Sequence, residues 1–330
     1  MVGGNFTLRV METQKLTVMA RREVAKDIVE WTLADSNGRL LPGHQAGAHI
    51  DVFITPQIAR AYSLTQPSGG QPTPHYVVAV ALAAQSRGGS AHLHQHLQLG
   101  NTLEVGLPRN LFAMVDSTAP ILLIAGGIGV TPLLAMARER QAQGRHWQLV
   151  LAARSRAHAA YVDELQAMSG QLQTHFDDEH GGQPLNVSAL FNSLDRATHV
   201  YCCGPQPLMD KVREVALSFG HPADHLHFES FGGTQNAPMD GDHAFALKLD
   251  RSGQEIEVPV GVSILDALEL AGVIVPSVCR EGNCGSCECM VLDGEVDHRD
   301  QILSEQERQA NKSMMICVSR AKGERLVIDL

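Results

Sequence analysis

Short apolar segments separated by Gly, Pro and Asn fill the first third of the chain. Five of them lie between Thr13 and Phe112: KLTVMARREV, AHIDVFI, ARAYSL, HYVVAVAL and NTLEVGL. Many short strands at this spacing, broken by turn residues, are typical of a closed antiparallel barrel. The pattern therefore predicts an antiparallel β-barrel domain over residues 1–114.

A different rhythm begins at Pro120, where buried-type strands alternate with helical patterns. The predicted strands are ILLIAGG, HWQLVLAA and THVYCCG, and the helical patterns that follow them are TPLLAMARERQAQG, HAAYVDELQAM and PQPLMDKVREVALSFG. Strands that alternate with helices of this length predict an α/β unit with a parallel sheet. We assign residues 115–231 to this second domain.

The last quarter of the chain begins after a segment without periodic apolar positions. Residues 232–242, GGTQNAPMDGD, are rich in Gly, Pro, Asn and Asp and predict a linker. AFALKLDRSGQEIEVP then predicts a hairpin, and SILDALELAG predicts a short helix with Ser263 as N-cap and Gly272 at its end. Residues 243–330 form the predicted third domain.

Composition and charge narrow the class of protein. A chain of 330 residues is too long for one core, and no apolar run approaches the length that crosses a bilayer. The N-terminus lacks a secretory pattern, so we expect a cytoplasmic protein, and we expect a monomer without a membrane partner. A net charge of −10 argues against nucleic acid as a partner. Residues 241–330 carry 16 acidic and 9 basic side chains, which fits either a solvated surface or an acidic docking face for a protein.

Four of the seven cysteines have a spacing typical of iron and sulfur binding. Their order is C-x4-C-x2-C with a fourth cysteine further on, which is the plant-type 2Fe–2S pattern. A zinc site would need a second C-x2-C pair or a histidine pair, and the reducing cytoplasm disfavours structural disulfides. We therefore predict a 2Fe–2S cluster bound by Cys279, Cys284, Cys287 and Cys317.

The remaining cysteines have other predicted roles. Cys289 lies on a strand that leaves the cluster loop, and Cys202 ends a buried strand, so both are predicted core residues. Cys203 comes directly before Gly204 and Pro205. It is therefore closer to the place where a ligand would lie at the carboxyl end of a parallel strand.

A second site is predicted where glycines follow two strands of the α/β domain. IAGGIGVTP, residues 124–132, combines a strand, a glycine-rich turn and a helix N-terminus, which attracts phosphate. YCCGP ends another strand, and open α/β sheets bind ligands across the carboxyl ends of their strands. The predicted nucleotide site contains Gly126, Gly127, Gly129, Thr131, Pro132, Cys203, Gly204 and Pro205. The cluster HFDDEH, residues 175–180, lies in a glycine-bounded loop and is not an expected metal site.

The predicted barrel contributes two further motifs. ARAYSLTQP contains Arg60, Tyr62 and Ser63, although Arg-x-Tyr-Ser alone also fits an ordinary strand with one exposed Arg. QSRGGSAH places a charge, exposed N–H groups and a hydroxyl in one turn at the start of a helix. That combination predicts a phosphate clamp.

These motifs carry a family resemblance. RAYSL, RGGS, GGIGVTP, YCCGPQPLMD, FESFG and the C-terminal CREGNCGSC, DGEVDHRD and CVSRAK resemble the phthalate dioxygenase reductase family, which includes vanillate O-demethylase reductases. The resemblance covers nearly the whole chain in the same domain order. It implies a ferredoxin-reductase-like flavin barrel, an NAD(P)H-binding α/β domain and a plant-type ferredoxin domain of β-grasp fold.

The resemblance also implies roles for individual residues. RGGS matches the FMN-binding branch, so the flavin is expected to be FMN. It would be held by Arg60, Ala61, Tyr62, Ser63, Arg87, Gly88, Gly89 and Ser90. Phe231 in FESFG would stack on the flavin ring until the nicotinamide displaces it. The residues expected in the hydride step are Ser63, Thr131, Cys203 and Phe231.

The nucleotide preference depends on the end of the strand HWQLVLAA. The resembling proteins often carry an acidic residue there to bind the adenosine ribose, whereas this chain has Ser155 between Arg154 and Arg156. Loss of the acid permits a 2′-phosphate and an Arg could bind it, but the resemblance favours NADH. We predict NADH as the preferred donor, with measurable use of NADPH.

Together these features predict a reductase component. A pyridine nucleotide gives up two electrons as a hydride, a 2Fe–2S cluster accepts one, and a flavin can convert between the two. The predicted acceptor is a separate Rieske-type terminal oxygenase or demethylase that docks on the acidic ferredoxin domain. The alternatives are a stand-alone flavin or ferric reductase, which leaves the ferredoxin unexplained, and a non-enzymatic redox-sensing iron–sulfur protein.

Overall fold

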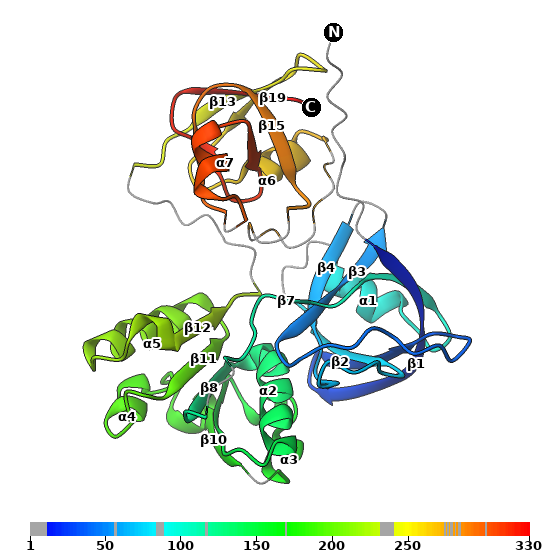
Figure 1. Cartoon of the computed structure of the whole chain (residues 1–330), viewed down its shortest axis with the longest axis vertical. Coiled ribbons are helices and arrows are strands. Elements are labelled where there is room, and N and C mark those ends of the chain that lie inside the picture. Colours follow the sequence, from blue (N-terminus) through cyan, green and yellow to red (C-terminus); the bar gives the residue numbers. More distant parts are fainter. Residues whose placement is uncertain are drawn as a thin grey trace. The chain divides into compact units, whose positions relative to one another are not determined.

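The structure is a computed structural model of the chain. It describes residues 12–55, 58–83, 89–115, 118–168, 170–231, 241–273, 275, 277, 280, 282, 285–300 and 302–330. Two compact units are present: one contains Thr13–Val52 and Ala61–Phe231, and the other contains 241–330 and Phe53–Arg60. Figure 1 labels their helices and strands. None of the helices in the described part of the chain is both long and apolar enough to span a bilayer.

The predicted barrel consists of the N-terminal part of the first unit together with Phe53–Arg60, the short segment of two of its strands that is assigned to the other unit. Its elements are β1 (Thr13–Ala25), β2 (Ile28–Ala34), β3 (Ala48–Thr55), β4 (Ile58–Ser63), β5 (Tyr76–Ala81), α1 (Gly89–His96), β6 (Thr102–Gly106) and β7 (Arg109–Asn110). The strand order is β4-β3-β6-β1-β2-β5, with β7 paired to β3. An antiparallel bridge between Leu64 and Val78 joins the two ends of this order, so the sheet curls back on itself. The sequence did not predict β2. All seven of its residues are buried or half-buried, so the strand lacks the alternation of apolar and polar residues that marks a strand with one exposed face.

The rest of this unit is the predicted parallel sheet. Its strands are β8 (Ile121–Gly126), β9 (Gln148–Ala153), β10 (Gln171–Phe176), β11 (His199–Cys203) and β12 (Leu226–Glu229). Its helices are η1 (Gly127–Gly129), α2 (Val130–Ala142), η2 (Arg156–His158), α3 (Val162–Gln166), η3 (Asp177–His180), α4 (Val187–Phe191), α5 (Gln206–Ser218) and η4 (Ala223–His225). The strand order is β10-β9-β8-β11-β12, and every pair is parallel.

Alternation along the strands buries both faces of this sheet. Leu123 and Ala125 belong to one apolar core with residues of α2 and α3, whereas Leu122 and Ile124 belong to another with residues of α4 and α5. The same alternation separates the two adjacent cysteines of β11, because Cys203 lies in the first core and Cys202 in the second. Neighbouring residues of one strand therefore face different helices.

Two parts of the α/β region differ from the pattern that the sequence predicts. The helix expected over HAAYVDELQAM is confined to α3, because Tyr161 before it takes a left-handed conformation with φ +64°. The strands β10 and β12 add to the three that the sequence predicts. In β10, only His175 and Phe176 at its end are buried, so its apolar signal is weak.

The second unit contains the ferredoxin-type fold. Its elements are β13 (Phe245–Leu249), β14 (Glu255–Val258), α6 (Ile264–Leu270), β15 (Glu288–Asp293), β16 (Val296–Asp297), α7 (Glu305–Ala310), β17 (Ser313–Met315), β18 (Arg320–Ala321) and β19 (Arg325–Ile328). The sheet order is β14-β13-β19-β15-β17. The predicted hairpin and capped helix are confirmed: β13 pairs with β14, and the Ser263 hydroxyl accepts a hydrogen bond from Asp266 N at 2.9 Å. Gly272 ends the helix with φ +79°.

Candidate functional site

The order of the parallel strands creates a crevice between β8 and β11. From β8 the chain moves outward through β9 and β10, and then returns to the other side of β8 with β11 and β12. Such a reversal leaves an opening at the carboxyl ends of the two central strands, where open α/β sheets bind nucleotides. Both predicted glycine motifs lie there, one after β8 and one after β11.

The two motifs touch closely enough that only glycine fits at three positions. A Cβ on Gly129 would lie 2.1 Å from the Cys203 carbonyl oxygen, and one on Gly126 would lie 2.6 Å from Pro205 Cδ. A Cβ on Gly204 would lie 2.9 Å from Gly126 Cα. Since such contacts forbid a side chain, these glycines allow two backbone segments to lie directly against each other at the end of the sheet.

Other predicted nucleotide residues lie around this crevice with defined local contacts. Thr131 is buried and donates its hydroxyl to the Ile128 carbonyl at 3.0 Å, so it stabilises the turn, and Pro132 is buried in the first turn of α2. Ser155 shares a 2.7 Å hydrogen bond with His158 Nδ1. Arg156 pairs with exposed Asp163 at 3.1 Å, whereas Arg154 is exposed at the end of β9.

An acidic loop beside Arg154 was not part of the predicted site. Asp177, Asp178 and Glu179 follow β10, the strand next to β9, and the Asp178 N–H donates to the Arg154 carbonyl at 3.2 Å. The loop therefore lies at the same carboxyl edge as the rest of the crevice. Sequence analysis missed it because β10 was not recognised as a strand, although the run of acids after QLQTHF was visible.

Glu229 is a second residue that the sequence did not single out. It ends β12 directly beside Cys203 in the strand register, and its Oε2 is buried without a hydrogen-bond partner among the described residues. Burial raises the pKa of Glu229 to about 8, so the neutral acid is favoured near neutral pH. Phe231, two residues later, is 43% exposed and thus accessible as an aromatic surface.

The barrel residues predicted to hold the flavin are only partly described. Ser63 ends β4 and is buried, and its hydroxyl has no hydrogen-bond partner among the described residues, which suits a polar ligand group. Arg60 donates to the Ala59 carbonyl at 2.8 Å, while Ala61 is exposed and Tyr62 half-buried. Gly89 and Ser90 begin α1 as the phosphate clamp requires. Arg87 and Gly88 lie outside the described residues.

A polar network joins the barrel to the α/β region within the first unit. Arg138 of α2 donates to the Thr65 carbonyl at 2.8 Å, two residues after Ser63, and to Glu164 at 2.7 Å. Glu139 accepts the Ala46 N–H at 2.9 Å. Because the glycine turn leads directly into α2, this helix links the nucleotide crevice to the strand that carries Ser63.

A buried tyrosine extends this network. The Tyr161 hydroxyl donates to Glu30 Oε2 at 2.8 Å, and Arg22 pairs with both Glu30 at 3.0 Å and Glu164 at 2.7 Å. Burial is the main cause of the raised pKa of Tyr161, and the neighbouring Glu30 carboxylate raises this pKa further. The Tyr161 hydroxyl therefore stays protonated and remains a hydrogen-bond donor. The barrel and the sheet are therefore held by directional contacts from several strands and helices.

In the second unit, the two predicted cluster ligands that the structure describes lie close in the fold. Cys287 and Cys317 are buried in one apolar core, and Ile316 N donates to the Cys287 carbonyl at 3.3 Å. Gly282 and Gly285 have φ +72° and +77°, a left-handed backbone that favours glycine. The two cysteine sulfurs fit a 2Fe–2S cluster. Cys279 and Cys284 lie outside the described residues.

Fold and sites together define a class of protein: a flavin barrel and a nucleotide-binding sheet of ferredoxin-reductase type, fused to a plant-type ferredoxin. Residues 123–214 match the oxidoreductase NAD-binding domain family, and residues 247–322 match the 2Fe-2S iron-sulfur cluster binding domain family.

Comparison with whole proteins extends the similarity from these two domains to the full chain. It is 42% identical over 316 residues to the reductase subunit of the toluene-4-sulfonate monooxygenase system of Comamonas testosteroni, covering 96% of this chain and 98% of that protein. It is 39% identical over 320 residues to phthalate dioxygenase reductase of Burkholderia cepacia, covering 96% and 97%. A solved structure of phthalate dioxygenase reductase matches 96% of this chain and 98% of its own with a TM-score of 0.72 and 38% identity.

The chain belongs to the phthalate dioxygenase reductase family. The predicted fold, cofactors and enzyme class are thereby confirmed: it is an oxidoreductase that uses NADH, FMN and a 2Fe–2S cluster. It passes electrons to a separate terminal oxygenase.

Proposed function

We propose that the hydride step takes place where the β8–β11 crevice meets the barrel residue Ser63, and that the acceptor is a Rieske-type oxygenase. The observation that supports the site is the close contact of the turn Gly126–Gly129 with Cys203–Pro205 at the switch point of the sheet. FMN supplies the conversion of a two-electron donor into single electrons. The chain supplies position, polarity and exclusion of water.

Each residue then has a defined task. The helix N-terminus at Gly129 binds the pyrophosphate, and the Ser63 hydroxyl, buried and without a described partner, binds the polar edge of the flavin. Cys203 lies beside Glu229 at the carboxyl ends of the strands, with its side chain fully buried in the core beneath the site. The neutral carboxyl of Glu229 adds no charge near the reacting carbon. Phe231 covers the flavin when no nucleotide is bound.

Adjacent cysteines provide the experiment for this site. Cys203→Ala should slow the reduction of FMN by NADH, measured by stopped-flow absorbance, about tenfold. Cys202→Ala is the matched control, because Cys202 belongs to the core on the opposite face of the sheet. Equal rates of FMN reduction in Cys203→Ala and Cys202→Ala would contradict the assignment of Cys203 to the site.

We also propose that the acidic loop 177–179 selects NADH. The loop follows β10 at the carboxyl ends of the parallel strands, beside Arg154. There its carboxylates can accept hydrogen bonds from the ribose hydroxyl groups of NADH and repel the 2′-phosphate of NADPH. This loop takes the role that the sequence pattern expected at Ser155. The double change Asp177→Asn and Asp178→Asn should raise kcat/KM for NADPH about tenfold and lower it for NADH. Asp195→Asn, before β11 at the opposite edge, is the control.

The docking partner is the remaining part of the proposal. The acidic excess of residues 241–330 favours an oxygenase with a basic face at its electron entry site. Electron transfer to the oxygenase should then slow as ionic strength rises, whereas reduction of FMN by NADH should not. We propose that the reductase acts as a monomer, which light scattering of the loaded protein tests.

A further inference from the structure

The turn that follows β16 lies directly against the loop of the cluster ligands. A Cβ on Gly282 would lie 2.9 Å from Asp300 Cα and 2.7 Å from Val318 Cγ2, next to the ligand Cys317. A Cβ on Gly285 would lie 3.3 Å from Ile302 Cδ1. Asp300 and Ile302 therefore lie against Gly282 and Gly285, two positive-φ glycines between the predicted cluster ligands. The Ile302 contact is made by its apolar side chain.

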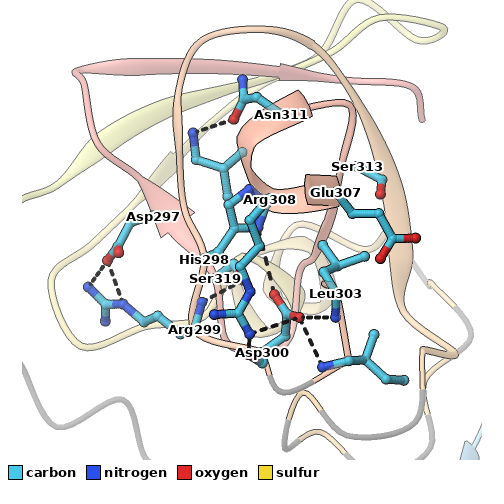
Figure 2. Close-up of polar contacts among 12 residues, drawn as sticks. Asp297, His298, Arg299, Asp300, Leu303, Glu307, Arg308, Asn311, Ser313 and Ser319 are labelled. Atoms are coloured by element: carbon cyan, nitrogen blue, oxygen red, sulfur yellow. Dashed lines mark hydrogen bonds and ion pairs between the residues drawn. The ribbon is translucent and has the colours of Figure 1, made fainter. Parts of the chain in front are cut away.

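The side chain of Asp300 holds this turn in shape (Figure 2). Its carboxylate is fully buried, and Oδ2 accepts the N–H groups of Ile302 at 3.1 Å and Leu303 at 2.8 Å. Arg308 of α7 donates to the Asp300 carbonyl oxygen. Because both N–H groups point to one oxygen, the carboxylate determines where the Ile302 side chain lies.

The charge of this carboxylate is only partly balanced. The Arg308 guanidinium lies 3.8 Å from Oδ2, and His298 Nδ1 lies 3.7 Å from Oδ1. Burial lowers the pKa of His298 although Asp300 opposes the effect, so the imidazole is neutral near neutral pH. Arg299 is directed to Asp297 in Figure 2, and it also pairs with Asp242. Asp300 thus places a weakly compensated negative charge beneath the cluster loop.

We propose that Asp300 is a positioning residue that lowers the reduction potential of the 2Fe–2S cluster. A bound cluster would gain negative charge on accepting one electron, and the nearby buried carboxylate would raise the free energy of that state. By holding Ile302 over the loop, Asp300 also keeps out water that would solvate the added charge. A lower potential favours onward transfer of the electron to the oxygenase. This inference rests on the cluster being the last carrier of the reductase.

The test separates charge from shape with three variants. Asp300→Asn keeps an oxygen for the N–H groups of Ile302 and Leu303 but removes the charge, Asp300→Ala removes both, and Ile302→Ala removes only the cover. Asp293→Asn, exposed at the end of β15, is the matched control. Iron content is measured first, and the midpoint potential is then obtained from a redox titration followed by electron paramagnetic resonance.

We expect Asp300→Asn to favour the reduced cluster about tenfold, which is a rise of about 59 mV for one electron. Ile302→Ala should also raise the potential, Asp300→Ala should raise it most, and Asp293→Asn should leave it unchanged. An iron-loaded Asp300→Asn protein with the wild-type potential would overturn the inference. If that variant binds no iron, a wild-type potential in Ile302→Ala overturns it instead. Wild-type protein whose cluster NADH cannot reduce would contradict the proposed electron path itself.

Discussion

Cysteines of this chain differ in what surrounds the sulfur. Burial raises the pKa of Cys289 to about 12, and the residue is packed in the core between β15 and its neighbours. A thiol whose pKa is raised this far stays protonated near neutral pH and is a poor metal ligand, since the thiolate is the form that binds iron. Cys287 lies two residues earlier, where the loop rather than the strand determines its direction.

This difference leads to a prediction about cluster binding. Serine at position 279, 284, 287 or 317 should abolish or strongly reduce bound iron and the visible absorbance of the cluster. Cys289→Ser should retain the cluster, with a stability loss of about 1–3 kcal/mol from a buried hydroxyl. Loss of iron from Cys289→Ser alone would show that the predicted ligand set is wrong.

Glu229 predicts a pH dependence of stability. Its pKa is about 8 in the folded protein instead of 4.5, so the folded state binds the extra proton between these values. The free energy of unfolding should therefore fall from about pH 4.5 to pH 8 and then level off, relative to Glu229→Gln. Urea unfolding followed by tryptophan fluorescence measures this, because Trp31 and Trp147 lie in the same unit. A difference between the two proteins that is constant with pH would refute the assignment.

At the scale of elements, α2 has two functions in one helix. Its N-terminus continues the glycine turn of the crevice, and Arg138 in its middle reaches the Thr65 carbonyl of the barrel. We infer that this helix fixes the spacing between the proposed nucleotide and flavin sites. Spacing matters because hydride transfer requires the reacting atoms to lie about 3–3.5 Å apart.

Arg138→Ala should therefore affect rate as well as stability. Loss of hydrogen bonds from a charged group costs about 1.5–3 kcal/mol, and reduction of FMN at saturating NADH should slow at least several-fold. Lys211→Ala is the control, because its exposed pair with Glu214 on α5 contributes about 0–1 kcal/mol. If Arg138→Ala lowers stability without slowing FMN reduction, α2 does not determine the spacing.

At the scale of the whole molecule, hydride transfer and cluster binding are assigned to different units of the chain. The residues of the proposed hydride site belong to the first unit, whereas all four predicted cluster ligands belong to the second. Among the predicted flavin ligands, Arg60 is assigned to the second unit. The boundaries at residues 114, 231 and 242 stay predictions, and most of the proposed linker lies outside the described residues.

Modularity predicts the behaviour of a fragment that ends at Gly233. It should bind FMN and oxidise NADH with ferricyanide as acceptor, because these steps need only the barrel and the parallel sheet. It should fail to reduce the oxygenase, because it lacks the cluster. Full-length protein with Cys317→Ser provides the control for the missing cluster. A folded, flavin-loaded fragment without NADH oxidation would mean that the ferredoxin takes part in hydride transfer.

Sequence alone determined the features that depend on neighbours along the chain. The C-x4-C-x2-C spacing, the Ser263 cap and the turn glycines are local, because thiolate spacing, capping hydrogen bonds and positive φ involve only a few successive residues. Alternation of apolar residues likewise predicted most barrel strands and the main αβ repeats. The weakly apolar β10 and the doubly buried β2 lacked that local signal.

Tertiary structure decided which distant residues share a site. Sheet order places Gly126 against Pro205, the acidic loop beside Arg154, and Glu229 beside Cys203. Pairing between strands, rather than residue type, also leaves Glu229 buried with a raised pKa. The contact of Asp300 with Gly282 arises in the same way, since two loops meet only after the ferredoxin sheet has formed. Charge and burial at such points depend on contacts between remote segments, which no local pattern contains.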